Sequence, residues 1–201
     1  MEVFDCLQGS EEWFAARLGK VTASCFSDVL CKGSGRKTYM MELVAERLTG
    51  ERQKGYCDKN MQDGSDKESD ARVFYESLND LPVQQVGFVA LNDNVGCSPD
   101  GLVGEDGLIE IKCPLASTHI VTLLKGKMST TYTPQVQGQL WVTGRKWCDY
   151  VSFAPQMKQR PFYCTRVFRD DKYIKVIEMA VEQFVTELNE LISKVINQTP
   201  F

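Results

Sequence analysis

The chain has 201 residues, of which 43% are hydrophobic and 25% are charged, and its formal net charge is −4. This length and composition are those of a soluble globular protein with a sizeable core, so we expect residues 1–201 to form one domain. No apolar run approaches membrane-spanning length, and residues 1–10 lack a signal-peptide pattern. The sequence therefore predicts a cytoplasmic protein without a membrane partner.

Cysteine and histidine usage excludes two kinds of metal site. None of the eight cysteines forms a pair with C-x2-C spacing, which argues against a zinc ribbon. Most of them neighbour apolar residues, as is typical of small buried side chains in a reducing compartment. His119 is the single histidine of the chain, which excludes a nuclease centre built from several histidines.

Charge is distributed unevenly along the chain. Residues 58–110 contain twelve acids and three bases, whereas residues 113–176 contain ten bases and three acids. The first segment could supply metal ligands and the second a surface that contacts phosphates. The alternative interpretation is that both segments are ordinary solvated surface.

Helices are predicted in the first part of the chain. Ser10 is a predicted N-cap with Gly19 as the helix stop, and Thr22 is predicted to cap the next helix. Residues 31–37 and 52–63 are predicted to be loops. The predicted helices cover residues 10–18, 23–30, 38–48 and 65–77.

Strands and helices alternate in the remainder of the chain. The predicted strands cover residues 83–91, 95–98, 108–113, 147–154 and 162–169. The predicted helices cover residues 117–124, 134–143 and 171 to about 197, and apolar positions of the last helix form one stripe that packs the core or another subunit. This order predicts an α/β (α+β) fold with a central mixed β-sheet flanked by helices.

The most informative pattern joins Asp100, Glu110 and Lys112. It reads P-D-x9-E-x-K and consists of a Pro-Asp-Gly turn followed by an apolar strand. Because side chains alternate along a strand, Glu110 and Lys112 share one face with Leu108, and the opposite face looks like the core face. A hairpin over residues 101–107 would fold Asp100 back beside Glu110.

This arrangement suits the hydrolysis of phosphodiesters. Two neighbouring carboxylates repel each other, and a bound cation relieves the repulsion. Oxygen ligands suit Mg²⁺ or Mn²⁺, which can generate hydroxide from bound water near neutral pH. Lys112 could orient that water or neutralise developing charge. The alternative is a surface strand with solvated neighbours, since short matches of this kind arise often by chance.

Four sequence blocks carry a resemblance to a known family. Together they span residues 8–143, and they occur in the family's order. The chain resembles the phage lambda exonuclease family of viral recombination nucleases, within the PD-(D/E)xK nuclease superfamily. The blocks are Gln8-Gly9-Ser10-Glu11-Glu12-Trp13 with Arg17-Leu18-Gly19 and Val21-Thr22-Ala23-Ser24; Gly64 with Glu68, Asp70-Ala71-Arg72 and Glu76; Cys97-Ser98-Pro99-Asp100-Gly101 with Glu110-Ile111-Lys112-Cys113-Pro114; and Gln135-Val136-Gln137 with Trp141-Val142-Thr143.

The resemblance implies a Mg²⁺-dependent exonuclease, with Mn²⁺ as a possible substitute. Such an enzyme degrades one strand of linear duplex DNA from 5′ to 3′, releases mononucleotides and leaves 3′ single-stranded tails for phage recombination. It implies a homotrimeric ring around DNA, which reconciles the acidic net charge with DNA binding because only the channel wall must be positive. A single-strand annealing protein is the implied partner, and the host cytoplasm the implied location.

The resemblance also assigns the chemistry to particular residues. Asp100 and Glu110 correspond to metal ligands, together with the backbone carbonyl of Ile111. Lys112 corresponds to the residue that positions the attacking water. Glu68 corresponds to a further acid near the metal.

A pocket for the terminal 5′-phosphate is implied at Arg17, Ser24, Ser98 and Gln137. Arginine offers a bidentate fork, and hydroxyls and an amide add neutral donors. Gln135 and Gln137 cannot share a helix face, and the resemblance selects Gln137.

The two predicted loops depart from the family pattern. In the family such regions help to melt the duplex end, and Arg36 and Lys37 are candidates for that role here. Two other functions stay open at this point: an endonuclease of the same superfamily, or a DNA-end-binding module without activity.

Overall fold

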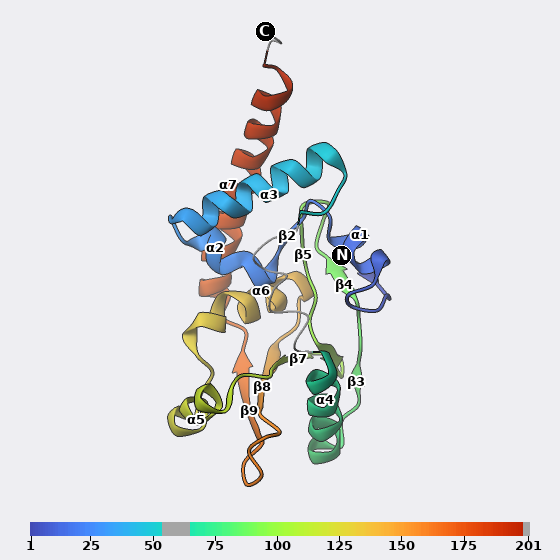
Figure 1. The fold of residues 1–201 in the computed structure, drawn as a ribbon, viewed down its shortest axis with the longest axis vertical. Coiled ribbons are helices and arrows are strands. Elements are labelled where there is room, and N and C mark those ends of the chain that lie inside the picture. The colour runs from blue at the N-terminus through green and yellow to red at the C-terminus, as the bar shows by residue number, and fades with distance from the viewer. Residues whose placement is uncertain (54–64, 199–201) are drawn as a thin grey trace.

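The computed structural model describes residues 1–53 and 65–198, with side chains from residue 67 in the second segment. Most of the predicted loop over residues 52–63, and Gly64 of the second sequence block, lie outside the described residues. Figure 1 shows helices packed around two β-sheets. The helices are α1 (Glu11–Arg17), α2 (Phe26–Leu30), α3 (Ser34–Thr49), α4 (Ser65–Asn79), α5 (Ala116–Lys125), α6 (Thr133–Thr143) and α7 (Asp171–Ile196).

The larger sheet has the strand order β3-β6-β7-β8-β9. Its members are β3 (Val83–Gln84), β6 (Gly101–Val103), β7 (Gly107–Lys112), β8 (Trp147–Phe153) and β9 (Phe162–Phe168). β7 and β8 run parallel, and the other neighbours run antiparallel. The chain between β7 and β8 forms α5 and α6, as expected because parallel neighbours need a long crossover connection. The predicted mixed sheet is therefore present.

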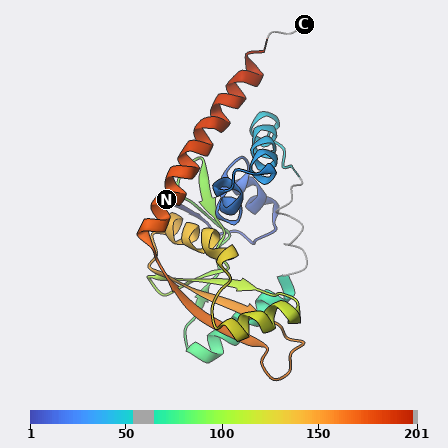
Figure 2. The ribbon, with the colours of Figure 1, turned by 90° about the vertical axis from the view of Figure 1, so that its left-hand side faces the viewer.

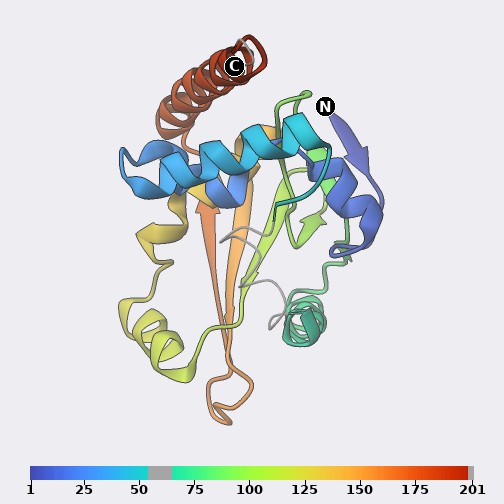
Figure 3. The same cartoon turned by 45° about the horizontal axis from the view of Figure 1, so that its top comes forward.

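Helices cover both faces of this sheet. Figure 3 shows α4 on one side of the strands and α5 on the other. Ala71 and Tyr75 of α4 form an apolar cluster with Ile109 and Ile111, whereas Val136 and Leu140 of α6 pack with Leu108. The idea of β7 as a solvated surface strand is wrong, because α6 covers the face that carries Glu110.

A smaller sheet has the order β1-β4-β5-β2 and lies beside the N-terminal helices. Its strands are β1 (Glu2–Phe4), β2 (Val21–Thr22), β4 (Phe88–Ala90) and β5 (Val95–Cys97). The prediction of one strand over residues 83–91 is wrong, because β3 and β4 belong to different sheets. The break covers residues 85–87 and ends at Gly87, where an added Cβ would clash with the carbonyl oxygen of Cys6.

The helix ends are set by local caps and by long-range contacts. Ser10 caps α1 as predicted, with its Oγ accepting from the amide of Trp13 at 3.3 Å. Thr22 makes no side-chain capping bond, and residues 23–25 form a 3₁₀ turn before α2. Helix α3 begins at Ser34, inside the predicted loop, and Arg36 in its first turn forms an ion pair with Glu187 of α7 at 2.8 Å.

The last helix, α7, packs its apolar stripe against the smaller helices. Ile177, Val181, Phe184 and Leu188 are buried in one cluster with residues of α2 and α3, and the helix then projects away from the rest of the chain (Figure 2). The predicted stripe therefore packs the core along most of its length. No helix in the described part of the chain is long and apolar enough to cross a membrane.

Candidate active site

The hairpin of β6 and β7 brings Asp100 and Glu110 together. Gly101 pairs with Ile109, so Asp100, one residue before β6, faces Glu110 across the antiparallel ladder. Oδ2 of Asp100 accepts a hydrogen bond from the backbone N–H of Ile111 at 2.6 Å. The two acids of the P-D-x9-E-x-K pattern therefore meet as the sequence predicts.

Glu110 is only 1% exposed, and side chains from two elements contact its carboxylate. Nζ of Lys112 lies 2.6 Å from Oε1. Gln135 and Gln139 of α6 donate to Oε1 and Oε2, each at 2.6 Å. An ammonium and two amide donors at this distance satisfy both oxygens of this buried carboxylate.

Asp100 and Glu68 both interact electrostatically with Glu110. Burial raises the pKa of Asp100 well above its ordinary value, and the charges of Glu110 and Glu68 raise it further. Burial also raises the pKa of Glu68; Lys112 opposes this shift and Glu110 adds to it. Glu68, in the first turn of α4, therefore lies within electrostatic range of Glu110 and Lys112 on β7.

Lys112 stays protonated at this site. Burial lowers its pKa, but the charges of Glu110 and Asp100 and the hydrogen bond to Glu110 outweigh burial, so the net pKa is raised. Its Nζ also lies 5.4 Å from the ring centroid of Tyr132, which stacks on Tyr150. Lys112 is therefore placed as a cation and a hydrogen-bond donor to Glu110 in this structure.

The donor set fits a hard divalent cation. Asp100, Glu110 and Glu68 offer oxygen ligands only, and their mutual repulsion is what a cation would relieve. Within residues 1–53 and 67–198, no three His, Cys, Asp or Glu side chains converge to ligate a metal by themselves. The residues thus fit a Mg²⁺-type site in which one or two carboxylates are completed by water and substrate oxygens.

A second polar cluster joins Arg17 of α1 to Ser98. Nη1 of Arg17 donates to Oγ of Ser98 at 3.1 Å, and Nε1 of Trp13 donates to the same oxygen at 2.9 Å. The guanidinium carbon of Arg17 also lies 4.2 Å from the ring centroid of Trp13. Stacking and hydrogen bonding hold the guanidinium fork in one orientation, which prepares it to bind an anion.

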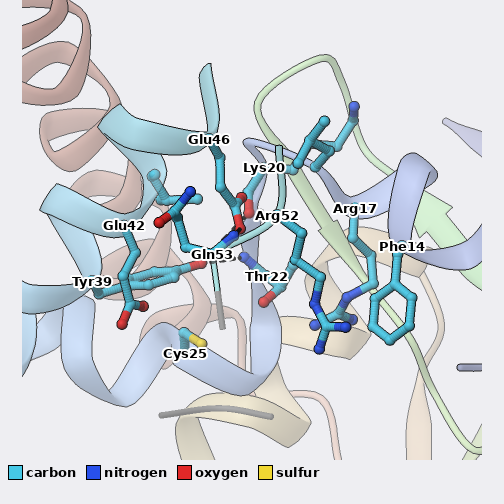
Figure 4. A pocket seen from close by; sticks show the side chains of 12 residues that line it. Phe14, Arg17, Lys20, Thr22, Cys25, Tyr39, Glu42, Glu46, Arg52 and Gln53 are labelled. Atoms are coloured by element: carbon cyan, nitrogen blue, oxygen red, sulfur yellow. Dashed lines mark hydrogen bonds between the residues drawn. The ribbon is translucent and has the colours of Figure 1, made fainter. Parts of the chain in front are cut away.

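The Arg17 cluster borders a pocket of about 70 Å³. Figure 4 shows the side chains of Arg17 and Arg52 lining this pocket together with Phe14 and Thr22. Oγ1 of Thr22 lies 3.2 Å from the hydroxyl of Ser24, an exposed residue. Arg17 and Ser98 are in direct contact, and Ser24 is linked to their pocket through Thr22.

Gln137 does not join the other predicted phosphate ligands. Its Nε2 donates to the carbonyl of Phe168 at 2.9 Å, and its Oε1 accepts from the amide of Asp170 at 2.9 Å. Both polar ends of the side chain therefore hold the connection between β9 and α7. The selection of Gln137 over Gln135 is corrected here, because Gln135 is the residue that faces the carboxylates.

Sequence reasoning missed Gln139, although a signal for it was present. Residues four apart share a helix face, so a side chain at position 139 must point the same way as Gln135.

Arg36 and Lys37, the candidates for strand separation, lie on α3 and line a groove against α7. Arg36 is engaged with Glu187 in that groove.

Comparisons with known proteins agree with this architecture. Residues 12–146 match the YqaJ-like viral recombinase domain. An alkaline exonuclease from Laribacter hongkongensis, LHK-Exo, has 44% sequence identity and a TM-score of 0.88 over 94% of this chain and 97% of that one. Its structure in complex with dAMP matches with 44% identity and a TM-score of 0.87 over 92% and 96% of the chains.

Two other matches are more distant. A phage-related exonuclease from Haemophilus somnus 129PT has a TM-score of 0.65 at 18% identity, over 88% of this chain and 96% of that one, which shows a shared fold. The uncharacterized protein ExoD of Escherichia coli (strain K12) is 24% identical over 68 residues, or 34% of this chain and 78% of that protein.

Proposed function

The chain belongs to the YqaJ-like viral recombinase family and is a DNA exonuclease, and we propose that it degrades one strand of linear duplex DNA from 5′ to 3′ in a Mg²⁺-dependent reaction. The family match confirms the resemblance that the four sequence blocks indicated. The match to LHK-Exo also confirms the α/β PD-(D/E)xK fold. We propose that residues 1–201 form one nuclease domain, since the site draws on elements from α1 to α6 and the later helix α7 packs against α2 and α3.

One observation supports the proposal that digestion starts at the 5′ end. Ser98, in contact with Arg17, is separated from Asp100 by one residue. Two residues of extended chain span about 7 Å, which is of the order of the distance between successive phosphates along a DNA strand. A terminal 5′-phosphate on Arg17, Ser98 and Ser24 would thus set the next phosphodiester beside Asp100 and Glu110. The complex of LHK-Exo with dAMP, a mononucleotide, supports such a product.

The residues of the site would have separate roles in hydrolysis. Asp100 and Glu110, with the carbonyl of Ile111, would hold the cation, and Glu68 would be a further acid near it. Bound there, Mg²⁺ or Mn²⁺ supplies Lewis acidity to a phosphoryl oxygen and lowers the pKa of a bound water. Lys112, kept protonated by Glu110 and Asp100, would orient the attacking water and stabilise negative charge on the phosphoryl group.

The assembly and the partners belong to the same proposal. A homotrimeric ring would keep the enzyme on one duplex between successive cuts and make digestion processive. The 3′ tails left behind would be bound by a single-strand annealing protein during phage recombination in the host cytoplasm. Sedimentation of the purified chain tests the ring, because a monomer in solution would contradict it.

Arg17 should make the reaction sensitive to the chemistry of the 5′ end. We expect wild type to digest a duplex with 5′-hydroxyl ends about 10–100-fold more slowly than one with 5′-phosphates. This is the loss of charge-assisted hydrogen bonds that contribute roughly 1.5–3 kcal/mol. Arg17→Ala should remove the difference, and Arg17→Lys, which keeps the charge without the fork, should retain part of it. Equal rates of wild type on both ends would contradict the pocket.

A further inference from the structure

Gln139 is a buried amide that contacts the proposed metal ligand Glu110. It lies on α6 with 1% of its surface exposed. Its Nε2 donates to Oε2 of Glu110 at 2.6 Å, while Gln135, one turn earlier, donates to Oε1 at the same distance. The i,i+4 spacing thus gives each carboxylate oxygen one amide donor from a single helix face.

Only one end of the Gln139 amide is used. Its Oε1 is buried without a hydrogen-bond partner in the described part of the chain. An unpaired buried amide oxygen destabilises the fold, and the neighbouring positions Val136 and Leu140 are apolar core residues. The hydrogen bond to Glu110 is therefore the one that this side-chain amide makes in the described residues.

The two glutamines differ in how firmly they hold the carboxylate. Gln135 is partly exposed and shares Oε1 with Lys112. Gln139 is buried and is the side chain that contacts Oε2 in the described residues. Because Gln135 is partly exposed and Gln139 is buried, a ligand arriving from solvent would meet the partners of Oε1 before it met Gln139.

We propose that Gln139 is a positioning residue that fixes the orientation of Glu110 through Oε2 and leaves Oε1 to bind the divalent cation. This inference rests on the proposed function, in which Glu110 is a metal ligand. Hydrogen bonds to ligating carboxylates orient them, and their loss typically lowers metal affinity or activity by about 10–100-fold. The expected signature of Gln139 is therefore a change in metal affinity that exceeds any change in stability.

Gln139→Met tests the proposal because it preserves side-chain length and removes the donor. Titration calorimetry of the DNA-free full chain with Mn²⁺ should show a Kd raised about tenfold or more over wild type. On linear duplex at saturating Mg²⁺, kcat should fall while KM for DNA ends stays unchanged. The Tm without metal should change little, since losing the donor to Oε2 of Glu110 and removing the unpaired amide oxygen have opposite effects on stability. A merely structural role would instead lower Tm and leave the Mn²⁺ Kd unchanged.

Gln137→Met is the matched control on the same helix. Gln137 is equally buried, at 3% exposure, but its amide bonds to the backbone of Phe168 and Asp170. This variant should lower Tm and leave the Mn²⁺ Kd at the wild-type value. Gln139→Asn, which keeps an amide too short to reach Glu110, should reproduce the weaker Mn²⁺ binding and serves if the methionine variant does not fold.

Glu110→Gln separates failure of the inference from failure of the proposed function. If wild type binds Mn²⁺ more tightly than Glu110→Gln, the metal site stands, and a Kd for Gln139→Met within twofold of wild type overturns the positioning role alone. If wild type binds Mn²⁺ no better than Glu110→Gln, the proposed metal site is wrong. The positioning role of Gln139 is then contradicted as well.

Discussion

Lys112→Ala should abolish measurable hydrolysis of linear duplex DNA while DNA ends are still bound. The variant removes a protonated ammonium 2.6 Å from Glu110, and we expect kcat to fall by at least about 10²–10³-fold, as for the loss of one preorganised donor at a reacting oxygen. The fold should survive, because Gln135 and Gln139 still donate to Glu110. Single-turnover digestion with Mg²⁺ measures the chemistry, and filter binding in Ca²⁺ measures the complex.

Lys194→Ala is the control for the loss of one lysine charge. Lys194 is exposed near the end of α7, outside the proposed site, and its removal should leave kcat unchanged. Full activity of Lys112→Ala in Mg²⁺ would contradict the proposed mechanism. Loss of both hydrolysis and end binding would instead mean that Lys112 holds the substrate.

Asp100→Asn should separate the stability of the fold from its activity. The substitution removes one of the two central carboxylates, and we expect kcat/KM with Mg²⁺ to fall by about 10²-fold or more, in line with the loss of a metal ligand. The Asn oxygen can still accept the hydrogen bond of the Ile111 amide. Digestion of 5′-labelled duplex across a Mg²⁺ titration measures the effect.

The same variant should be more stable than wild type in the absence of metal. The pKa of Asp100 is higher in the folded chain than its ordinary value, so protonated Asp100 favours the fold, and stability is lost as pH rises through the raised pKa. Asparagine cannot ionise, so its advantage in Tm should grow with pH, by about 2–4 °C for each kcal/mol in a chain of this length. Asp106→Asn, in the exposed turn of the same hairpin, should show neither effect.

The central motif could be predicted from the sequence because local rules determine it. Alternation along a strand places Glu110 and Lys112 on one face, and the turn over residues 101–107 returns Asp100 to Glu110. These relations involve neighbours in sequence or a short hairpin. The burial of Glu110 could not be predicted in the same way, since it depends on α6, which follows about 25 residues later.

The choice between Gln135 and Gln137 shows where sequence reasoning stops. Helical geometry establishes that the two side chains point in different directions, but it does not say which direction faces the sheet. That is decided by the packing of Val136 and Leu140 on Leu108. The resulting orientation turns Gln135 and Gln139 toward Glu110 and Gln137 toward the start of α7.

The prediction of a single strand over residues 83–91 is wrong for a similar reason. Its composition is that of a strand throughout, yet β3 and β4 join different sheets. Gly87, the last residue before β4, closely approaches Cys6, which is distant in sequence. Local propensity gave the type of these elements, and long-range packing determined their partners.

The central claim is end-dependent digestion from 5′ to 3′, and strand-specific labelling of one linear duplex tests it most directly. With Mg²⁺, a 5′ label should appear at once as a labelled mononucleotide, whereas a 3′ label on the same strand should stay in long fragments until late in the digestion. A covalently closed circle of the same sequence should stay intact. Early release of the 3′ label, or cutting of the circle, would contradict the account.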